Sequence, residues 1–516
     1  MDYDSAAGRP DGGRRRFLKQ AGTVALGGLL LRGSALASAA HSMPPAEATP
    51  DFNPDVEIDL SAVVDKVGLL PGAPTTVWRF TGKVLRGNPD TLSFLESSES
   101  GPHFVPVMRL RRGQKVRIFF TNRLPEKSIV HWHGLHIVQR MDGHPIYAIG
   151  TGSRYVYEFV VDNRAGTYWF HPHPHERTGF QVYHGLAGLF LVSDDEENAA
   201  QLPRGPFDLP LVIQDRTFDS RNQLVYLQTR MERMMGFAGE RILVNARPDY
   251  TRRVERTAYR LRLFNGSNAT AYRLSLSNGQ PFLVIGTDGG LLEQAMTRRT
   301  LTLAVAERAD VWLDFGTAQS GQEVSLVAQP FAPMMQTQAN AGPRVIARFR
   351  VGTGAAKKSS PPARLSKFPA LDLREAVNRE RPRRFQMSMM RGQSFLNGRT
   401  FEMEAVADDE RVKLGTTEVW EFVNDSPMAH PMHIHNLHFR VIERSDVTST
   451  AGDPNGLSAG FTDEGLKDVV LVLPGQRVKV LMKFEDHTGL YLYHCHILEH
   501  EDLGMMRNYR VEGKGA

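Results

Sequence analysis

The sequence predicts an all-β protein made of several β-sandwich domains, and three observations support this fold class. Short apolar runs typical of strands recur along the chain, turn residues separate them, and convincing helical periodicity is scarce. The 516 residues are 41% hydrophobic and 23% charged, with 46 glycines and 30 prolines. A globular chain of this size, about 470 residues after an N-terminal signal, suggests about three domains.

The first part of the chain, residues 1–40, is expected to be a twin-arginine signal peptide. Three arginines and Phe17-Leu18-Lys19 precede an apolar, glycine-rich run, and an A-x-A-like segment follows. The run of about eleven apolar residues is well short of the ~20 that span a bilayer. We therefore expect export by the twin-arginine translocation machinery, cleavage near Ala37 or Ala39, a periplasmic or otherwise exported product, and no stable membrane insertion.

Three stretches of strand-like runs then predict three domains, at 51–195, 204–352 and 384–513. A charged stretch from Ser193 to Ala200 ends the first, and residues 354–373, rich in Lys, Ser and Pro, predict an exposed linker before the third. The formal net charge of +5 is small and its basic residues are dispersed, so we expect no nucleic-acid partner. We also expect a monomer. The strand-like runs include 75–80, 105–110, 115–122, 155–161, 186–192, 259–264 and 311–315.

The only cysteine of the chain, Cys495, lies between His494 and His496, with His500 and Met505 five and ten residues beyond it. A thiolate, two imidazoles and a weak axial thioether are the ligands of a blue-copper electron-transfer site. The preceding residues 489–493 predict a buried strand. If this strand continues, His494 and His496 project to one face and the cysteine to the other, so the thiolate and its neighbours would serve two metal sites. The alternative is a buried free cysteine beside unrelated histidines.

The other histidines weaken that alternative, because ten of the eighteen fall in four tight clusters. Each cluster holds an His-x-His pair, and in a strand such a pair places both imidazoles on one face. Four pairs supply eight imidazoles, which suits a multinuclear site for copper, zinc or iron. The clusters occupy only the first and third stretches, so the site should lie where those two meet. The clusters are His131 and His133; His171 and His173; His430, His433 and His435; and His494, His496 and His500.

These four clusters, in this order and at these separations, resemble the copper motifs of the multicopper oxidases, the family of laccases, bilirubin oxidases and bacterial copper-efflux oxidases. Residues 286–293 (GTDGGLLE) and 306–311 (AERADV) also resemble the metal-free second domain of that family. The resemblance covers nearly all of residues 51–513. It implies three consecutive cupredoxin-like β-sandwich domains, with copper ligands in the first and third only.

The resemblance also implies four coppers per chain and a ligand set in which every position is filled. One type 1 (blue) copper would take His430, Cys495 and His500, with Met505 axial. One type 2 copper would take His131 and His433. Two type 3 coppers would take His133, His171, His173, His435, His494 and His496.

Oxidases of this family take single electrons from a reductant and reduce O2 to water. The resemblance implies that the reductant approaches an exposed imidazole edge, with His500 as the candidate, and that electrons pass through Cys495 to His494 or His496. Water formation needs protons, and Asp142 and Glu501 are candidate proton relays. Five histidines outside the ligand positions are expected to support the site or lie on the surface: His136, His144, His175, His184 and His438.

The substrate is expected to be a small aromatic reductant, such as a phenol or an aromatic amine. Copper-efflux oxidases carry a long methionine-rich insertion, whereas this chain offers Met387, Met389, Met390 and Met403, which we interpret as core residues. A periplasmic cuprous oxidase, oxidising Cu(I), and a non-catalytic copper-binding or scaffold protein remain the alternatives. A copper nitrite reductase does not explain three further His-x-His pairs, and ten clustered histidines exceed one tetrahedral zinc site.

Overall fold

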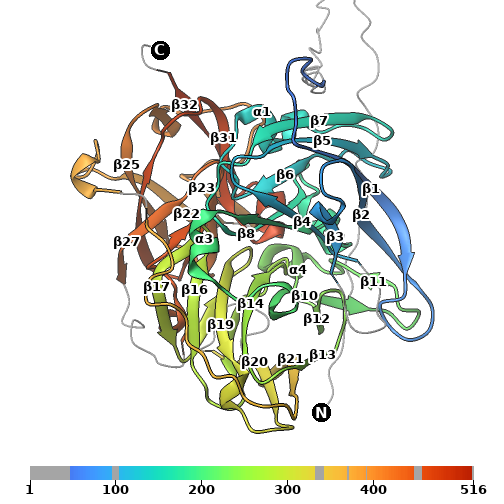
Figure 1. Ribbon diagram of the computed structural model, residues 1–516. Helices are drawn as coiled ribbons and strands as arrows, with labels where there is room; N and C mark the ends of the chain where they lie inside the picture. Colours follow the sequence, from blue (N-terminus) through green and yellow to red (C-terminus); the bar gives the residue numbers. More distant parts are fainter. Residues whose placement is uncertain are drawn as a thin grey trace, which may run out of the picture. The chain divides into compact units, whose positions relative to one another are not determined.

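The computed structural model describes residues 47–95, 104–331, 342–368, 371–390, 392–446 and 456–513, without the side chain at position 446. The expected signal peptide, His41 and His103 lie outside these residues. The described chain is mostly β-strand, which confirms the predicted all-β class, and Figure 1 shows the strands running from blue through yellow to red along the chain. Its described helices include none that is long and apolar enough to cross a membrane.

The first two sheets use strands between residues 56 and 193. A four-stranded sheet has the order β2-β1-β5-β7, and a five-stranded sheet has the order β3-β4-β9-β8-β6. Ile58 and Phe120 of one sheet share a hydrophobic cluster with Trp132 and Phe170 of the other, so the two sheets pack as a sandwich. The strands are β1 (Val56–Val67), β2 (Thr75–Arg86), β3 (Leu92–Phe94), β4 (Pro106–Arg111), β5 (Lys115–Asn122), β6 (Val130–His133), β7 (Arg154–Val160), β8 (Gly166–Pro172) and β9 (Gly188–Ser193).

The next two sheets use strands between residues 208 and 351. One has the order β11-β10-β14-β19-β16-β17, with β12 on β10, and the other the order β13-β21-β20-β15-β18. Leu261 and Val311 pack with Leu326 and Phe349 in their shared core. The strands are β10 (Asp208–Phe218), β11 (Leu224–Val225), β12 (Arg241–Val244), β13 (Tyr250–Val254), β14 (Ala258–Asn265), β15 (Tyr272–Leu276), β16 (Phe282–Thr287), β17 (Gly290–Arg298), β18 (Leu301–Leu303), β19 (Arg308–Asp314), β20 (Glu323–Gln329) and β21 (Arg344–Val351).

The last two sheets use strands between residues 383 and 512, in the orders β23-β22-β25-β30-β27-β28 and β24-β32-β31-β26-β29. Trp420 and Phe422 of the first pack against Tyr493 and Cys495 of the second. The strands are β22 (Arg383–Met390), β23 (Gln393–Leu396), β24 (Arg411–Lys413), β25 (Thr417–Asn424), β26 (His430–Ile434), β27 (Phe439–Asp446), β28 (Leu466–Lys467), β29 (Val469–Val472), β30 (Gln476–Lys483), β31 (Gly489–Cys495) and β32 (Met506–Glu512).

The described helices are short and connect strands. Asp194 caps one of them by accepting a hydrogen bond from the backbone N–H of Glu197, within the charged stretch that the sequence placed at the end of the first domain. The α-helices are α1 (Gln139–Asp142), α2 (Thr178–Tyr183), α3 (Asp195–Ala200), α4 (Arg230–Met235) and α5 (Leu498–Asp502). Single turns of 3-10 helix occur at Pro89–Thr91, Pro145–Tyr147, Gly205–Phe207, Phe315–Thr317, Leu373–Glu375, Asp408–Glu410 and Leu457–Gly460.

Two expectations need correction. The strand predicted at residues 75–80 continues to Arg86 as half of a long hairpin with β1. The linker predicted to be exposed carries no strand in its described residues, but Leu365 and Ser366 are buried. Leu365 joins the core of the middle sandwich, and Ser366 donates to the backbone carbonyl of Leu292 at 2.8 Å. Apolar packing of Leu365 and Phe368 together with the hydrogen bonds of Ser366 anchors this segment.

Candidate metal centre

Strands β6 and β8 bring the first two histidine clusters together. In their antiparallel register His131 lies opposite His171 and His133 opposite Trp169. Alternation along β6 places His131 and His133 on the same face, and the ring of His131 lies 5.3 Å from that of His171 and 5.5 Å from that of His173. All four side chains are fully buried.

Strands β26 and β31 bring the last two histidine clusters together. His433 lies opposite His494, and Met432 lies opposite Cys495. The strand ends at Cys495, and His496 continues it with a backbone hydrogen bond to the carbonyl of Pro431. The rings of His494 and His496 lie 5.3 Å apart, whereas the thiol of Cys495 belongs to the core between the last two sheets. The predicted alternation of imidazole, thiol and imidazole is therefore present.

The eight imidazoles of the four His-x-His pairs meet between the first and the third sandwich. His131 stacks on His435 and His133 stacks on His433, both at 3.8 Å between ring centroids, and His173 lies 5.2 Å from His494. Burial lowers the pKa of most of these imidazoles well below the usual value, so they are neutral bases at pH 7.

Hydrogen bonds at the rim of this cluster decide which nitrogen of an imidazole faces its centre. The Nδ1 of His131 lies 2.6 Å from the carbonyl oxygen of Asp142, and a carbonyl only accepts, so Nδ1 carries the proton. The lone pair of His131 is then on Nε2, which is buried without a hydrogen-bond partner. Buried unpaired acceptors are costly unless something binds them, and convergent imidazole lone pairs fit copper. Other unpaired nitrogens here are Nδ1 of His133 and His173, Nε2 of His171 and His433, and both of His496.

On the opposite face of β31, Cys495 forms a second group with two imidazoles. The Nδ1 atoms of His430 and His500 lie 3.3 Å and 3.6 Å from its Sγ. The Nε2 of His500 donates to the carbonyl of Met234 at 3.0 Å, which leaves the Nδ1 lone pair toward the thiol. Met505 is buried in the same core, and its backbone carbonyl accepts from the N–H of Cys495. Burial raises the pKa of the thiol, and a coordinating cation reverses this by binding the thiolate.

The expectation of an exposed His500 edge is wrong. His500 is fully buried, because helix α4 covers it and supplies the Met234 carbonyl. A capping box fixes the start of this helix: the hydroxyl of Thr229 accepts from the N–H of Glu232, and the carboxylate of Glu232 accepts from the N–H of Thr229.

Both candidate relay acids are buried against ligand candidates. The Oδ2 atom of Asp142 lies 2.7 Å from Nδ1 of His435. The carboxyl oxygens of Glu501 lie 3.6 Å from Nδ1 of His173 and 3.3 Å from Nδ1 of His494. Burial raises the pKa of Glu501 well above its usual value, which favours the protonated acid.

Sequence reasoning missed Asp468, whose carboxylate lies 3.0 Å from Nε2 of His133. An aspartate before an apolar run carries no local signal, and only the fold brings it here. Burial by itself would raise its pKa, but the charge of Arg308 holds it well below the usual value. Two of the five histidines left outside the ligand set contact buried polar groups: Nε2 of His438 lies 3.7 Å from Oδ2 of Asp468, and Nε2 of His144 donates to Oδ1 of Asn508 at 2.9 Å.

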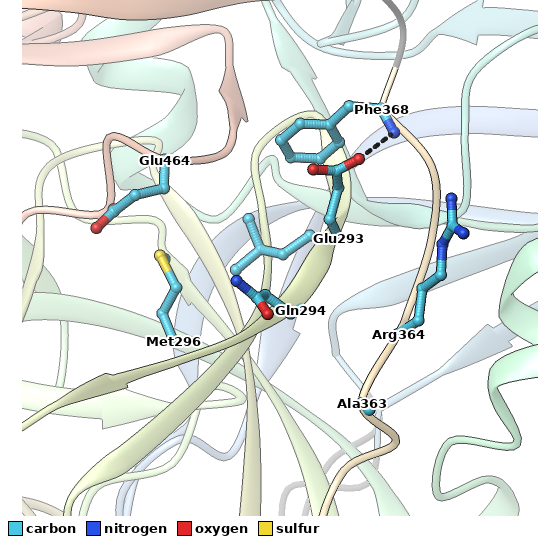
Figure 2. A pocket seen from close by; sticks show the side chains of 8 residues that line it. Glu293, Gln294, Met296, Ala363, Arg364, Phe368 and Glu464 are labelled. Atoms are coloured by element: carbon cyan, nitrogen blue, oxygen red, sulfur yellow. Dashed lines mark hydrogen bonds between the residues drawn. The ribbon is translucent and has the colours of Figure 1, made fainter.

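The methionines interpreted as core residues divide into two groups. Met387 is fully buried in the last sandwich and Met389 packs against the same core, as expected. Met390 is 63% exposed and Met403 is 40% exposed, so the expectation is wrong for these two. A surface pocket of about 520 Å³ lies elsewhere, beside β17, and Figure 2 shows Glu293, Met296, Arg364 and Phe368 around it. None of the residues that line this pocket is a site residue expected from the sequence.

Comparison with known proteins agrees with the motifs. Residues 100–197 and 376–515 each match a family model described as multicopper oxidase. The multicopper oxidase mco of Staphylococcus haemolyticus is 35% identical over 412 residues, covering 79% of this chain and 81% of the relative. The laccase of Bacillus subtilis is 30% identical, covering 78% and 87%. The crystal structure of the McoA multicopper oxidase of Aquifex aeolicus is 35% identical, with a TM-score of 0.76 over 89% of this chain and 97% of that one.

The fold is thus all-β with three consecutive cupredoxin-like sandwiches, as the resemblance implied. On these motifs, this fold and these relatives, the chain is a member of the multicopper oxidase family, a family of copper-dependent oxidoreductases that use O2.

Proposed function

We propose that this protein couples the one-electron oxidation of small reductants at a type 1 copper to the four-electron reduction of O2 to two waters at a three-copper cluster. The observation that carries the proposal is the position of Cys495. Its thiol faces His430 and His500, while its two chain neighbours, His494 and His496, face the eight-imidazole cluster. Peptide bonds therefore join the two groups of ligands over a very short path.

The ligand assignment follows the family motifs, and the unpaired lone pairs support it. His430, Cys495, His500 and Met505 would hold the type 1 copper, and His131 and His433 the type 2 copper. His133, His171, His173, His435, His494 and His496 would hold the type 3 pair. Copper bound at these four positions would supply the electron acceptor and the centre that reduces O2.

The buried acids have the contacts that proton delivery requires. Asp142 orients His435 through Nδ1 and His131 through its main-chain carbonyl, and Glu501 lies within 3.6 Å of two further imidazoles. Burial raises the pKa of Glu501, and this favours the protonated form that a proton donor beside the cluster requires.

The reductant we propose is a phenol or an aromatic amine, because relatives at 30% identity are laccases. We place the three domains at residues 51–195, 204–352 and 384–513. Each pair of sheets draws its strands from one of these ranges, except that β22 begins one residue early, at Arg383. We also propose a monomer that the twin-arginine machinery exports to the periplasm.

A second candidate reductant is Cu(I), favoured by exposed thioethers of α4 and β22, since α4 also supplies the carbonyl that contacts His500. Met231 and Met390 are 57% and 63% exposed. Gly392 lies against α4, because a Cβ added at Gly392 would lie 3.8 Å from Sδ of Met234. Thioether sulfur is a soft ligand that suits Cu(I).

The test is copper content per chain of the mature, copper-loaded protein, with visible and EPR spectra of the same sample. About four coppers, an intense thiolate-to-copper band and two distinct EPR signals are expected for the proposed ligand set. Less than one copper after loading, with no blue band, would instead indicate a scaffold protein of the same fold. Initial rates with a phenol and with Cu(I) then distinguish the two reductants.

A further inference from the structure

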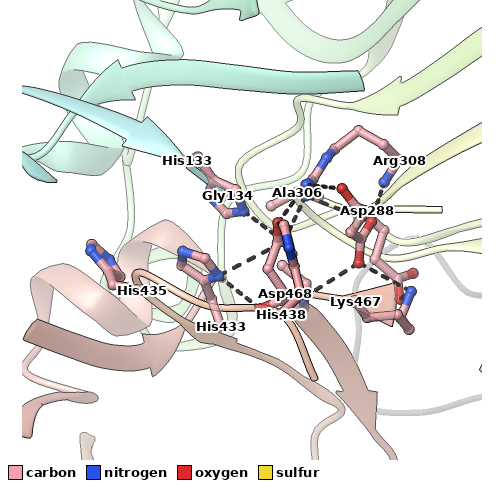
Figure 3. Close-up of polar contacts among 12 residues, drawn as sticks. His133, Gly134, Asp288, Ala306, Arg308, His433, His435, His438, Lys467 and Asp468 are labelled. Carbon is pink, nitrogen blue, oxygen red and sulfur yellow. Dashed lines mark hydrogen bonds and ion pairs between the residues drawn. The ribbon is translucent and has the colours of Figure 1, made fainter. Parts of the chain in front are cut away.

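A buried carboxylate, Asp468, lies between two ligand imidazoles and an arginine of the middle sandwich. Figure 3 shows Asp468 with His133 and His433 on one side and Arg308 on the other. Its Oδ1 lies 3.0 Å from Nε2 of His133, and its main-chain carbonyl lies 2.8 Å from Nδ1 of His433. Asp468, Arg308 and both histidines have fully buried side chains.

These two contacts select the tautomers of both imidazoles. A carboxylate and a carbonyl only accept hydrogen bonds, so His133 carries its proton on Nε2 and His433 carries its proton on Nδ1. The remaining nitrogens, Nδ1 of His133 and Nε2 of His433, are buried without a hydrogen-bond partner. The rings stack at 3.8 Å with an angle of 11°. Through these two contacts, Asp468 places the imidazole lone pairs on Nδ1 of His133 and on Nε2 of His433, where they can bind a metal.

Arg308 holds Asp468 in that position. It begins β19 in the middle sandwich, and its guanidinium grips both carboxylate oxygens, with Nη1 at 2.7 Å from Oδ1 and Nη2 on Oδ2. Its other three N–H groups donate to the backbone carbonyls of Thr167 (3.0 Å), Ala306 (2.9 Å) and Asp288 (3.1 Å). All five donors of the guanidinium are therefore used, and the fork cannot rotate away from the carboxylate.

We propose that Arg308 is a positioning residue of the three-copper cluster. It belongs to the sandwich that supplies no copper ligand, and it acts through Asp468 on His133 and His433. This inference rests on the proposed function. It assigns the middle sandwich a part in building the metal site in addition to its part in the packing of the chain.

A lysine cannot replace this arginine, because its three donors on a single nitrogen do not reproduce a planar fork with five fixed directions. A second group of ion pairs also joins the middle and third sandwiches, but it does not lie beside the imidazoles. Lys467 lies 2.9 Å from Glu307 and 3.2 Å from Asp288, on the side of the network away from the imidazoles in Figure 3. Within this network, the described contact with a ligand imidazole is made by Asp468.

The test compares Arg308→Met and Arg308→Lys with Arg260→Met in the copper-loaded, full-length protein. Arg260 is a matched control. It is equally buried, lies on the adjacent strand β14, and pairs with Asp310 and Glu197, but it does not contact Asp468. For each variant we would measure the unfolding temperature, the blue absorbance, the type 2 EPR signal and copper retention against a competing chelator.

For both Arg308 variants we expect a ten- to hundredfold weaker hold on copper at the cluster, the usual effect of removing a partner that orients a metal ligand. The type 2 EPR signal should change or disappear while the blue band persists. Arg308→Lys should retain little more copper than Arg308→Met and should show a similarly altered type 2 signal. Arg260→Met should lower the unfolding temperature with copper retention and EPR signals unchanged.

Two results would overturn the inference. One is an Arg308→Met protein that retains copper and an unaltered type 2 signal, with only a lower unfolding temperature. If that variant does not fold, the other is an Arg308→Lys protein with wild-type copper retention and EPR parameters. Absence of the blue band and of bound copper in the unsubstituted protein would instead contradict the proposed function itself.

Discussion

Met432 and Cys495 face each other across the antiparallel pair β26–β31, one register position from His433 opposite His494. Because side chains alternate between the faces of a sheet, this single step separates the thiol from the imidazoles. Two groups of metal ligands can therefore lie back to back on two neighbouring strands.

Replacing Cys495 by serine tests this separation. We expect Cys495→Ser to lose the blue absorbance and turnover, because a hydroxyl does not replace a thiolate, while the imidazole cluster still binds about three coppers. Absorbance spectra and copper analysis measure both. Ser426→Ala is the control: it removes the 2.6 Å contact of its hydroxyl with Nε2 of His430 but leaves the thiol, so the band should persist. A blue band in Cys495→Ser would contradict the ligand assignment.

The carboxylate of Asp142 is predicted to matter for oxygen reduction and not for oxidation of the reductant. Asp142→Asn keeps the shape of the side chain but removes the acid beside His435. We expect steady-state O2 consumption to fall by about 100-fold, the size of a typical general-acid contribution, with the blue copper still reduced by substrate. The surface variant Asp162→Asn, which loses only a contact with Arg112, should behave as the unsubstituted protein. Equal rates in the two variants would exclude the relay.

Gly143 is predicted to hold α1, and with it Asp142, against β6. Its φ is +89°, and an added Cβ would lie 2.2 Å from the carbonyl oxygen of Val130. Gly143→Ala should therefore reduce the free energy of unfolding by about 2–4 kcal/mol, from backbone strain and overpacking together. Gly113→Ala is the control, because φ is +92° there with nothing within 4 Å, so it should cost only ~1 kcal/mol. Equal losses in urea unfolding would show that the close contact is relieved.

The copper-free protein should be destabilised by mild acid. Burial lowers the pKa of His144 and His500 to about 4 and that of His494 to about 3, below the value near 6.5 of an unfolded chain. The stability that these neutral imidazoles contribute is present above pH 6.5 and is lost as pH falls toward 4. Each group that stays neutral in the folded protein contributes a slope of about 1.4 kcal/mol per pH unit.

Buried acids act in the opposite direction. Burial raises the pKa of Asp502 to about 8, so its contribution is present below pH 4 and is lost as pH rises through 8. Burial lowers the pKa of more imidazoles than the number of acids whose pKa it raises. Below pH 6.5 the loss from the imidazoles therefore dominates, and above it only the loss from the acids remains, so we expect the copper-free protein to be most stable near pH 6.5. Urea unfolding at pH 5, 6.5 and 8 checks this, and equal stability at pH 5 and 6.5 would contradict it.

The amino-acid sequence alone predicts the fold class, the histidine clusters and the alternation around Cys495. These depend on local spacing: a period of two along a strand decides which side chains share a face, whatever the rest of the chain does. The positions of Asp142 and Glu501 beside imidazoles also followed from motif position. Each acid contacts one ligand histidine that is close in sequence, His131 for Asp142 and His494 for Glu501. Their contacts with His435 and His173 depend on the fold.

Residues that reach the site from distant parts of the chain are identified only in the folded protein. His500 is buried because α4, more than 260 residues earlier, packs over it and supplies the carbonyl of Met234. Arg308 and Asp468 meet although 160 residues separate them, and neither lies in a histidine motif. Such contacts depend on how sandwiches pack against one another, which the period of a strand does not encode. The contacts of Asp468 with His133 and His433, and of Arg308 with Asp468, therefore come from the packing of the three sandwiches.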